Sequence, residues 1–184
     1  MKYRLEVDDA PETVPGGTGI LLLHPSTADT DRVDSQFLAT DTDRYLVVST
    51  RTTASEVEEK LEFFGVESRQ ATIIDAISVE RGYSRRESDR VHYLAAPDDV
   101  EGLIETAEDF FKLYSGKLRV SLDSITELAF YASEQQAIDA VDELLRLLEE
   151  YDAVGLFHLA SEVHDPAFVD DIRSHFDVVI ELDG

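Results

Sequence analysis

Residues 118–128 read Leu-Arg-Val-Ser-Leu-Asp-Ser-Ile-Thr-Glu-Leu, the most informative segment of the chain. It has the pattern of a buried strand that ends at an aspartate, followed by a hydroxyl residue and the apolar beginning of a helix. In nucleotide-binding α/β proteins, an aspartate at the end of such a strand holds a hydrated magnesium ion beside a phosphate. The sequence contains no Gly-x-x-x-x-Gly-Lys-Ser/Thr loop to bind that phosphate. Asp123 therefore predicts one half of a nucleotide site without the other half.

Short apolar segments alternate with helical patterns along the whole chain. The predicted strands span residues 20–23, 45–49, 71–77, 91–94, 118–122, 153–159 and 178–182. The predicted helices span residues 31–39, 53–64, 97–114, 124–151 (as one helix or two) and 165–175. The strands are apolar on both faces, which is typical of a parallel sheet covered by helices on both sides. We therefore expect a single three-layer α/β domain over residues 1–184, with a mostly parallel sheet and with residues 1–15 as a lead-in segment.

The order of these elements resembles the RecA-like ATPase domain of the KaiC family, over residues 16–182. Residues 118–128 are similar to the family's Walker B strand and the hydroxyl-bearing turn that follows it. Gly-Gly-Thr-Gly-Ile-Leu-Leu-Leu (16–23) resembles the beginning of its first strand, and Asp-Val-Val-Ile-Glu-Leu (177–182) resembles a late strand. The resemblance implies a RecA-like sheet, with Asp123 and Ser124 as the remains of a metal site.

The sequence departs from this family where the chemistry is carried out. Residues 24–32, His-Pro-Ser-Thr-Ala-Asp-Thr-Asp-Arg, stand in place of the phosphate loop and contain neither glycine nor lysine. Asp29 and Asp31 would repel a phosphate by several kcal/mol at an effective dielectric constant of about 20. Residues 49–53 contain no acid that could activate water. The resemblance therefore implies an inactive ATPase homologue, with no catalytic residue and no bound cofactor.

Two functions remain open at this point. The first is a non-catalytic RecA/KaiC-like domain that acts as a regulatory or scaffolding protein. The alternative is a nucleotide-binding sensor or weak NTPase with a non-standard phosphate loop, in which Asp123 holds Mg-ATP and Arg32 or Arg51 supplies the cation. Asp123 and Ser124 are also explained as a simple helix cap, because an aspartate followed by a hydroxyl residue caps a helix well.

Charge is the extreme feature of the composition. The chain carries 40 Asp and Glu against 16 Lys and Arg, a formal net charge of −24 at pH 7. Such a surface repels itself until the Debye length falls to about 3 Å near 1 M salt, which favours a protein from the cytoplasm of a halophilic archaeon over a merely acidic mesophilic one. The same charge argues against binding to nucleic acids or anionic membranes. The absence of cysteine excludes disulfides and thiolate sites, and the longest aliphatic run, 20–23, is too short to span a bilayer.

Residues 80–90 form the one locally basic segment, because they contain Arg81, Arg85, Arg86 and Arg90. We interpret this segment as a docking loop for an acidic protein partner or for a second copy of the chain. The alternative is a mobile connector whose charges are paired internally.

Two further groups of polar residues follow predicted strands. His158, Glu162 and His164 could hold zinc, although histidines near strand ends are more often only hydrogen-bonded. Asp75 is expected to stabilise the turn after its strand.

Overall fold

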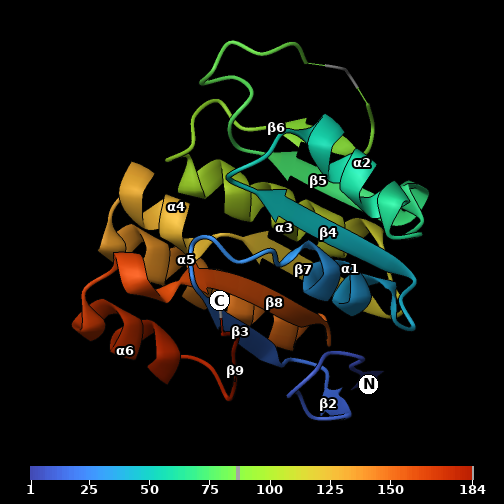
Figure 1. The fold of residues 1–184 in the computed structure, drawn as a ribbon. Helices are drawn as coiled ribbons and strands as arrows, with labels where there is room; N and C mark the ends of the chain where they lie inside the picture. Colours follow the sequence, from blue (N-terminus) through green and yellow to red (C-terminus); the bar gives the residue numbers. More distant parts are fainter. Residues whose placement is uncertain (86–87, 184) are drawn as a thin grey trace.

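The protein, described as a computed structural model over residues 1–85 and 88–183, is built on one large parallel sheet (Figure 1). The sheet has seven strands in the order β6-β5-β4-β7-β8-β3-β9, and every pair of neighbours in it is parallel. Its strands are β3 (Gly19–His24), β4 (Arg44–Ser49), β5 (Ala71–Asp75), β6 (Val91–Tyr93), β7 (Leu118–Asp123), β8 (Val154–Ala160) and β9 (Val178–Glu181). The predicted parallel α/β sheet is confirmed, with strand ends displaced by one or two residues.

Helices cover both faces of this sheet, as the sequence predicts. One face carries α1 (Asp31–Ala39) and α2 (Ala54–Phe63), and the other carries α3 (Val100–Leu113), α4 (Ile125–Tyr131), α5 (Glu134–Glu150) and α6 (Pro166–Ser174). Two short 3-10 turns, η1 (Ser68–Gln70) and η2 (Ser161–Val163), precede β5 and α6. Successive strand residues point to opposite faces, so Ile20 and Leu22 join one apolar core while Leu21 and Leu23 join the other. The three-layer architecture is therefore confirmed.

The predicted helical region 124–151 forms two helices. Ser133 separates them, because its hydroxyl accepts the backbone N–H of Gln136 at 3.0 Å and caps the start of α5. Thr53 and Asp99 cap α2 and α3 in the same way. No helix in the described part of the chain is both long and apolar enough to cross a bilayer.

The predicted lead-in segment is folded. It forms an antiparallel ribbon of β1 (Lys2–Arg4) and β2 (Thr13–Pro15). Tyr3 in this ribbon is fully buried; its hydroxyl donates to the carbonyl of Asp152 at 2.7 Å and accepts the backbone N–H of Leu118 at 3.2 Å. These long-range hydrogen bonds attach the beginning of the chain to the amino-terminal end of the sheet.

A buried arginine makes a second attachment. Arg119 in β7 is 0% exposed, and its Nη2 donates to the carbonyl of Arg4 at 2.7 Å. Its guanidinium lies over the rings of Tyr3 and Phe37, 5.4 and 5.2 Å from their centroids. Cation–π attraction partly replaces the hydration that this charge loses, although burial still lowers the pKa of Arg119 to about 10.

The sheet order brings the carboxyl ends of β4, β7, β8 and β3 side by side. In open parallel sheets, ligands bind beyond these ends. His24, Ser49 and Asp123 are the last residues of their strands, and they define the candidate site.

Candidate functional site

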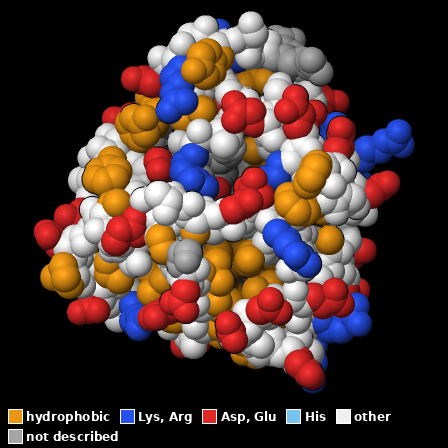
Figure 2. All heavy atoms as spheres, viewed as in Figure 1, with side chains coloured by type: hydrophobic (Ala, Val, Ile, Leu, Met, Phe, Trp, Pro, Cys, Tyr) orange, Lys and Arg blue, Asp and Glu red, His pale blue; other side chains and the backbone are white. Residues whose placement is uncertain are grey.

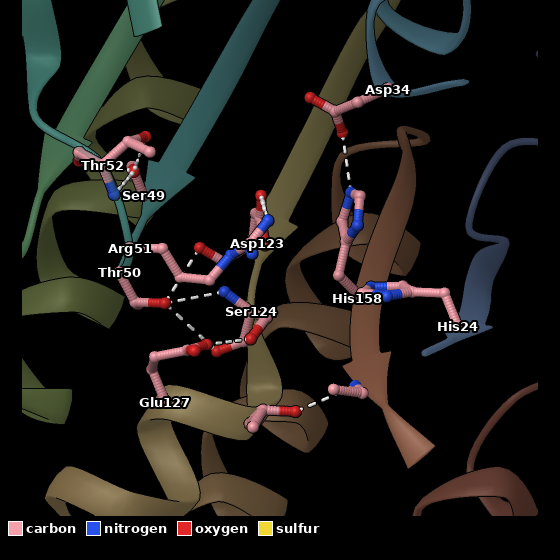
Figure 3. Close-up of polar contacts among 12 residues, drawn as sticks. His24, Asp34, Ser49, Thr50, Arg51, Thr52, Asp123, Ser124, Glu127 and His158 are labelled. Atoms are coloured by element: carbon pink, nitrogen blue, oxygen red, sulfur yellow. Dashed lines mark hydrogen bonds and ion pairs between the residues drawn. The ribbon is translucent and has the colours of Figure 1, made fainter. Parts of the chain in front are cut away.

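An ion pair between Arg51 and Asp123 occupies the middle of the site (Figure 3). The neighbouring strands β4 and β7 place Ser49 opposite Asp123, so Arg51, two residues beyond Ser49, reaches across the strand ends. Its Nε donates to Oδ1 and its Nη2 to Oδ2, both at 2.8 Å. Both carboxylate oxygens are thus bound in a two-point pair, the strong form of such contacts.

Electrostatics keep this carboxylate ionised. Burial alone would raise the pKa of Asp123, but the charge of His158 and the guanidinium of Arg51 lower it below its usual value. The side chain of Asp123 is 13% exposed and that of Arg51 is 34% exposed. The guanidinium therefore closes the solvent side of a largely buried acid.

Thr50 fixes the turn between β7 and α4. Its hydroxyl donates to the carbonyl of Asp123 at 2.9 Å and accepts the backbone N–H of Ser124 at 2.7 Å, across a cis peptide bond. The Ser124 hydroxyl donates to the carboxylate of Glu127 and makes no capping bond to the backbone of α4. Ser124 therefore stands at the N-cap position of α4, as the helix-cap explanation predicts, but neither side chain makes the expected capping bond: Asp123 binds Arg51 and Ser124 binds Glu127.

A second buried acid lies in the first turn of α1. Asp34 is 1% exposed; its Oδ1 accepts from the Ser121 hydroxyl and, at 2.9 Å, from Nε2 of His158. Its Oδ2 accepts from Nζ of Lys60 at 3.3 Å, and the same Nζ lies 3.9 Å from a carboxylate oxygen of Asp31. Burial would raise the pKa of Asp34, but Lys60, His158 and Ser121 lower it well below its usual range. Asp34, at the start of α1, is thus a carboxylate paired with two basic groups of the chain itself, Lys60 and His158. It follows the segment that stands in place of a phosphate loop.

The sequence patterns do not predict this cluster of Asp34, Lys60 and Ser121. Asp34 has the appearance of an ordinary surface acid in a polar helix. The available signal was in the strands: Ser121 and His158 are polar residues within buried strands, and such groups require hydrogen-bond partners.

Two buried histidines lie next to each other, and their pKa values are shifted in opposite directions. The rings of His24 and His158 are 5.6 Å apart and nearly perpendicular. Burial lowers the pKa of His24, whose Nδ1 donates to the carbonyl of Pro25 at 2.8 Å. Burial would also lower the pKa of His158, but the charges of Asp123 and Asp34 raise it above its usual value. The two acids therefore favour the charged form of His158, whereas burial favours the neutral form of His24.

Carboxylates of the chain itself bind the backbone of residues 24–32, the segment in place of a phosphate loop. An oxygen of Glu162 accepts the backbone N–H of Ser26 at 2.6 Å. An oxygen of Asp29 accepts the backbone N–H of Asp31 at 3.1 Å. In a phosphate loop such amides bind phosphate oxygens, whereas these two are already bonded to acids.

The zinc alternative is wrong. His158 binds Asp34, Glu162 binds Ser26, and Nε2 of His164 lies 3.1 Å from the hydroxyl of Thr126. Across residues 1–85 and 88–183, no group of three or more His, Asp or Glu side chains is arranged to hold a metal.

The predicted role of Asp75 is confirmed. Its carboxylate is fully buried and accepts the backbone N–H groups of Ile77 and Ser78 in the turn after β5. It also accepts the N–H of Ala54 at 2.9 Å, which joins this turn to the start of α2.

The arginines of the proposed docking loop differ in their surroundings. Arg81 and Arg85 are exposed, whereas Arg90 is half-buried and its Nη1 donates to the carbonyl of Ser68 at 2.5 Å. Arg86 lies outside the described residues. Arg81 lies beside Arg51 in the wall of a pocket at the carboxyl end of the sheet, whereas the hydrogen bond of Arg90 is directed toward the segment before β5.

Comparison with solved structures shows a RecA-like α/β fold. The uncharacterized protein PH0321 from Pyrococcus horikoshii, in complex with an unknown peptide, is 16% identical with a TM-score of 0.69, over 91% of this chain and 78% of its own. A prototypical ATPase from the type III secretion system of pathogenic bacteria is 15% identical with a TM-score of 0.66, over 99% of this chain and 56% of its own. The flagellar accessory protein FlaH from Methanocaldococcus jannaschii is 16% identical with a TM-score of 0.63, over 98% of this chain and 79% of its own.

Sequence comparisons add a family. A family model described as "Family of unknown function (DUF7090)" matches residues 1–184. No curated protein matches the sequence.

Proposed function

We propose that this chain, which belongs to the family of unknown function DUF7090, is a non-catalytic RecA/KaiC-like domain that acts by binding another protein. It would serve as a regulatory or scaffolding protein, with a protein partner or a second copy of itself as ligand. The position that most resembles a nucleotide site, at the ends of β4 and β7, is filled by side chains of the protein itself.

The observation that carries the proposal is the Arg51–Asp123 pair. Magnesium binds carboxylate oxygens at close range and would require at least one oxygen of Asp123. Both oxygens already accept hydrogen bonds from the guanidinium. A metal ion would have to break a two-point ion pair and would also bring its charge next to Arg51, so the pair opposes metal binding.

The phosphate side of the site supports the same conclusion. The backbone N–H groups of Ser26 and Asp31 are bonded to Glu162 and Asp29, and Lys60 is bound to Asp34. A triphosphate would meet carboxylates where phosphate-binding sites present amides and a lysine. The local charge therefore disfavours an anionic ligand at the start of α1.

Charge and structural similarity suggest the setting. A net charge of −24 fits the cytoplasm of a halophilic archaeon. The structurally similar PH0321 is described with an unknown peptide, which is in keeping with a peptide segment as ligand here. The same net charge disfavours nucleic acids as partners.

A nucleotide sensor is the second candidate, favoured by the position of Asp123 at the end of β7. The deciding experiment measures melting temperature and phosphate release in molar KCl with millimolar Mg-ATP or Mg-GTP. A nucleotide at 100 times its Kd would add about 2.7 kcal/mol to the free energy of unfolding. We expect no shift, and no hydrolysis above a heat-denatured sample.

A matched variant tests the reason. If Arg51 is what opposes the metal, Arg51→Ala should be the form that gains any Mg-nucleotide stabilisation, and Arg51→Ala with Asp123→Ala should lose it. Stabilisation or hydrolysis by the unsubstituted protein would overturn the proposal.

A further inference from the structure

An exposed aromatic surface surrounds Arg81 at the carboxyl end of the sheet. We define it by Arg81, Tyr83, Phe130 and Tyr131. The three rings are 49%, 65% and 43% exposed, respectively. The side chains of Tyr131 and Tyr83 lie close to the guanidinium of Arg81 and raise its pKa above the usual value. Figure 2 shows hydrophobic and basic side chains together at the upper left of this face, over α4 and the loop that follows β5.

This aromatic surface borders a pocket. The pocket has a volume of about 320 Å³ and is lined by Thr50, Arg51, Arg81, Glu127, Phe130 and Tyr131. One of its rings has a stacking partner, because the ring of His164 lies on Phe130 with centroids 5.4 Å apart. The pocket is therefore a formed hollow with an apolar wall and a polar wall.

Only one of the two cations in this pocket is available for a ligand. Arg51 is paired with Asp123, and Glu127 accepts a hydrogen bond from Ser124. Arg81 has no carboxylate within ion-pair distance in the described part of the chain. The chain has 24 excess negative charges, so an exposed arginine that lies next to tyrosines and has no paired acid is positioned for a carboxylate from outside.

We propose that this pocket binds an acidic peptide segment of a partner protein, one that carries an apolar side chain next to a glutamate or aspartate. The carboxylate would form a two-point pair with Arg81, and the apolar side chain would pack on Phe130 and Tyr131, the kind of aromatic and arginine residues that dominate binding energies. The proposal rests on the function proposed above and names the chemistry of its partner.

Salt explains how an acidic protein can bind an acidic segment. In molar salt the Debye length is about 3 Å, so the repulsion of the whole surface is screened while a contact pair persists. A basic segment would instead place its charge against Arg81. An acidic ligand is therefore attracted by Arg81 at contact distance and is little repelled by the more distant acids of the protein surface.

The test uses acetyl-Glu-Phe-Glu-Leu-amide as probe and acetyl-Gln-Phe-Gln-Leu-amide as its neutral control. Both are titrated into the whole protein in molar KCl, and backbone amide shifts are followed by NMR. We expect saturable shifts at Arg81, Phe130 and Tyr131, and binding about tenfold weaker for the neutral peptide, since a hydrogen-bonded charge contributes on this scale. Equal binding of both peptides, or no shift at these residues, would overturn the inference.

Substitutions localise the effect. Arg81→Gln and Phe130→Ser should each weaken binding of the acidic peptide about tenfold. Arg146→Gln is the control: this exposed arginine of α5 is already paired with Glu143 and Glu150, and its loss should leave the affinity unchanged. Affinity unaffected by Arg81→Gln would contradict the assigned pocket.

A parallel titration with Mg-ATP separates this inference from the proposed function. Nucleotide-induced shifts at Thr50 and Asp123, or phosphate release, would refute the non-catalytic function whatever the peptides do. If neither peptide nor Mg-ATP changes the amide shifts, the non-catalytic function would still hold, but the peptide pocket would be refuted.

Discussion

Arg51 follows β4 and Asp123 ends β7, and two hydrogen bonds of 2.8 Å join these residues, which are far apart in the sequence. The guanidinium lies against the carboxylate that, in the resemblance drawn from the sequence, would hold a metal. The ion pair that opposes metal binding should therefore also contribute to the free energy of unfolding, which can be measured.

Breaking this pair should destabilise the fold. Arg51→Ala leaves a largely buried carboxylate without its partner, and we expect a loss of about 2 kcal/mol in the free energy of unfolding, less than for a fully buried pair because Arg51 is one-third exposed. Urea unfolding in molar KCl measures it. The double variant with Asp123→Ala should lose less than the sum of the single variants. Additive losses would show that the two residues are not coupled.

Lys60 should matter far more than a surface lysine. Lys60→Met removes a cation from Asp34, which is 1% exposed, so we expect a loss of about 3 kcal/mol in the free energy of unfolding. Lys112→Met, which breaks an exposed pair with Glu108, should lose at most about 0.5 kcal/mol. Similar losses in the two variants would contradict the described cluster.

The pKa of His158 predicts a pH dependence of stability. Because it is raised in the folded protein by Asp123 and Asp34, its stabilisation is fully present below the unfolded value of about 6.5 and is lost as pH rises through the folded value. The stability difference between the protein and His158→Gln should therefore shrink above pH 6.5. Taking this difference separates the effect from His24, whose lowered pKa acts in the opposite sense. A pH-independent difference would refute the raised pKa of His158.

Salt should stabilise the protein steadily from dilute buffer to molar KCl, because screening reduces repulsion among the acids. Differential scanning calorimetry would give the melting temperatures. A variant with Glu134→Gln, Asp139→Asn and Glu149→Gln, all exposed on α5, should depend less on salt. A melting temperature that does not change with KCl would contradict the interpretation of the charge.

The sequence predicts the strands and helices well, since fully apolar strands and helical spacing are local signals. Asp75 was also predictable, because a strand-end acid has turn amides within reach. The pairing of Arg51 with Asp123 has no local signal, because it depends on β4 lying next to β7. Neither the burial of Asp34 nor its cation has a local signal: Lys60 lies on another helix. Side chains that meet only through sheet order cannot be paired from local sequence patterns.

The attachment of Arg119 to the N-terminal ribbon has a consequence for the order of folding. Its hydrogen bond reaches a carbonyl 115 residues earlier in the chain, and closing a loop of that length costs entropy that only an already formed sheet can offset. During synthesis the ribbon emerges before β7, so its aromatic and guanidinium contacts do not exist until β7 has been made. We therefore expect the first strands of the chain to dock last and to open first, exchanging their amide hydrogens well before the central sheet does.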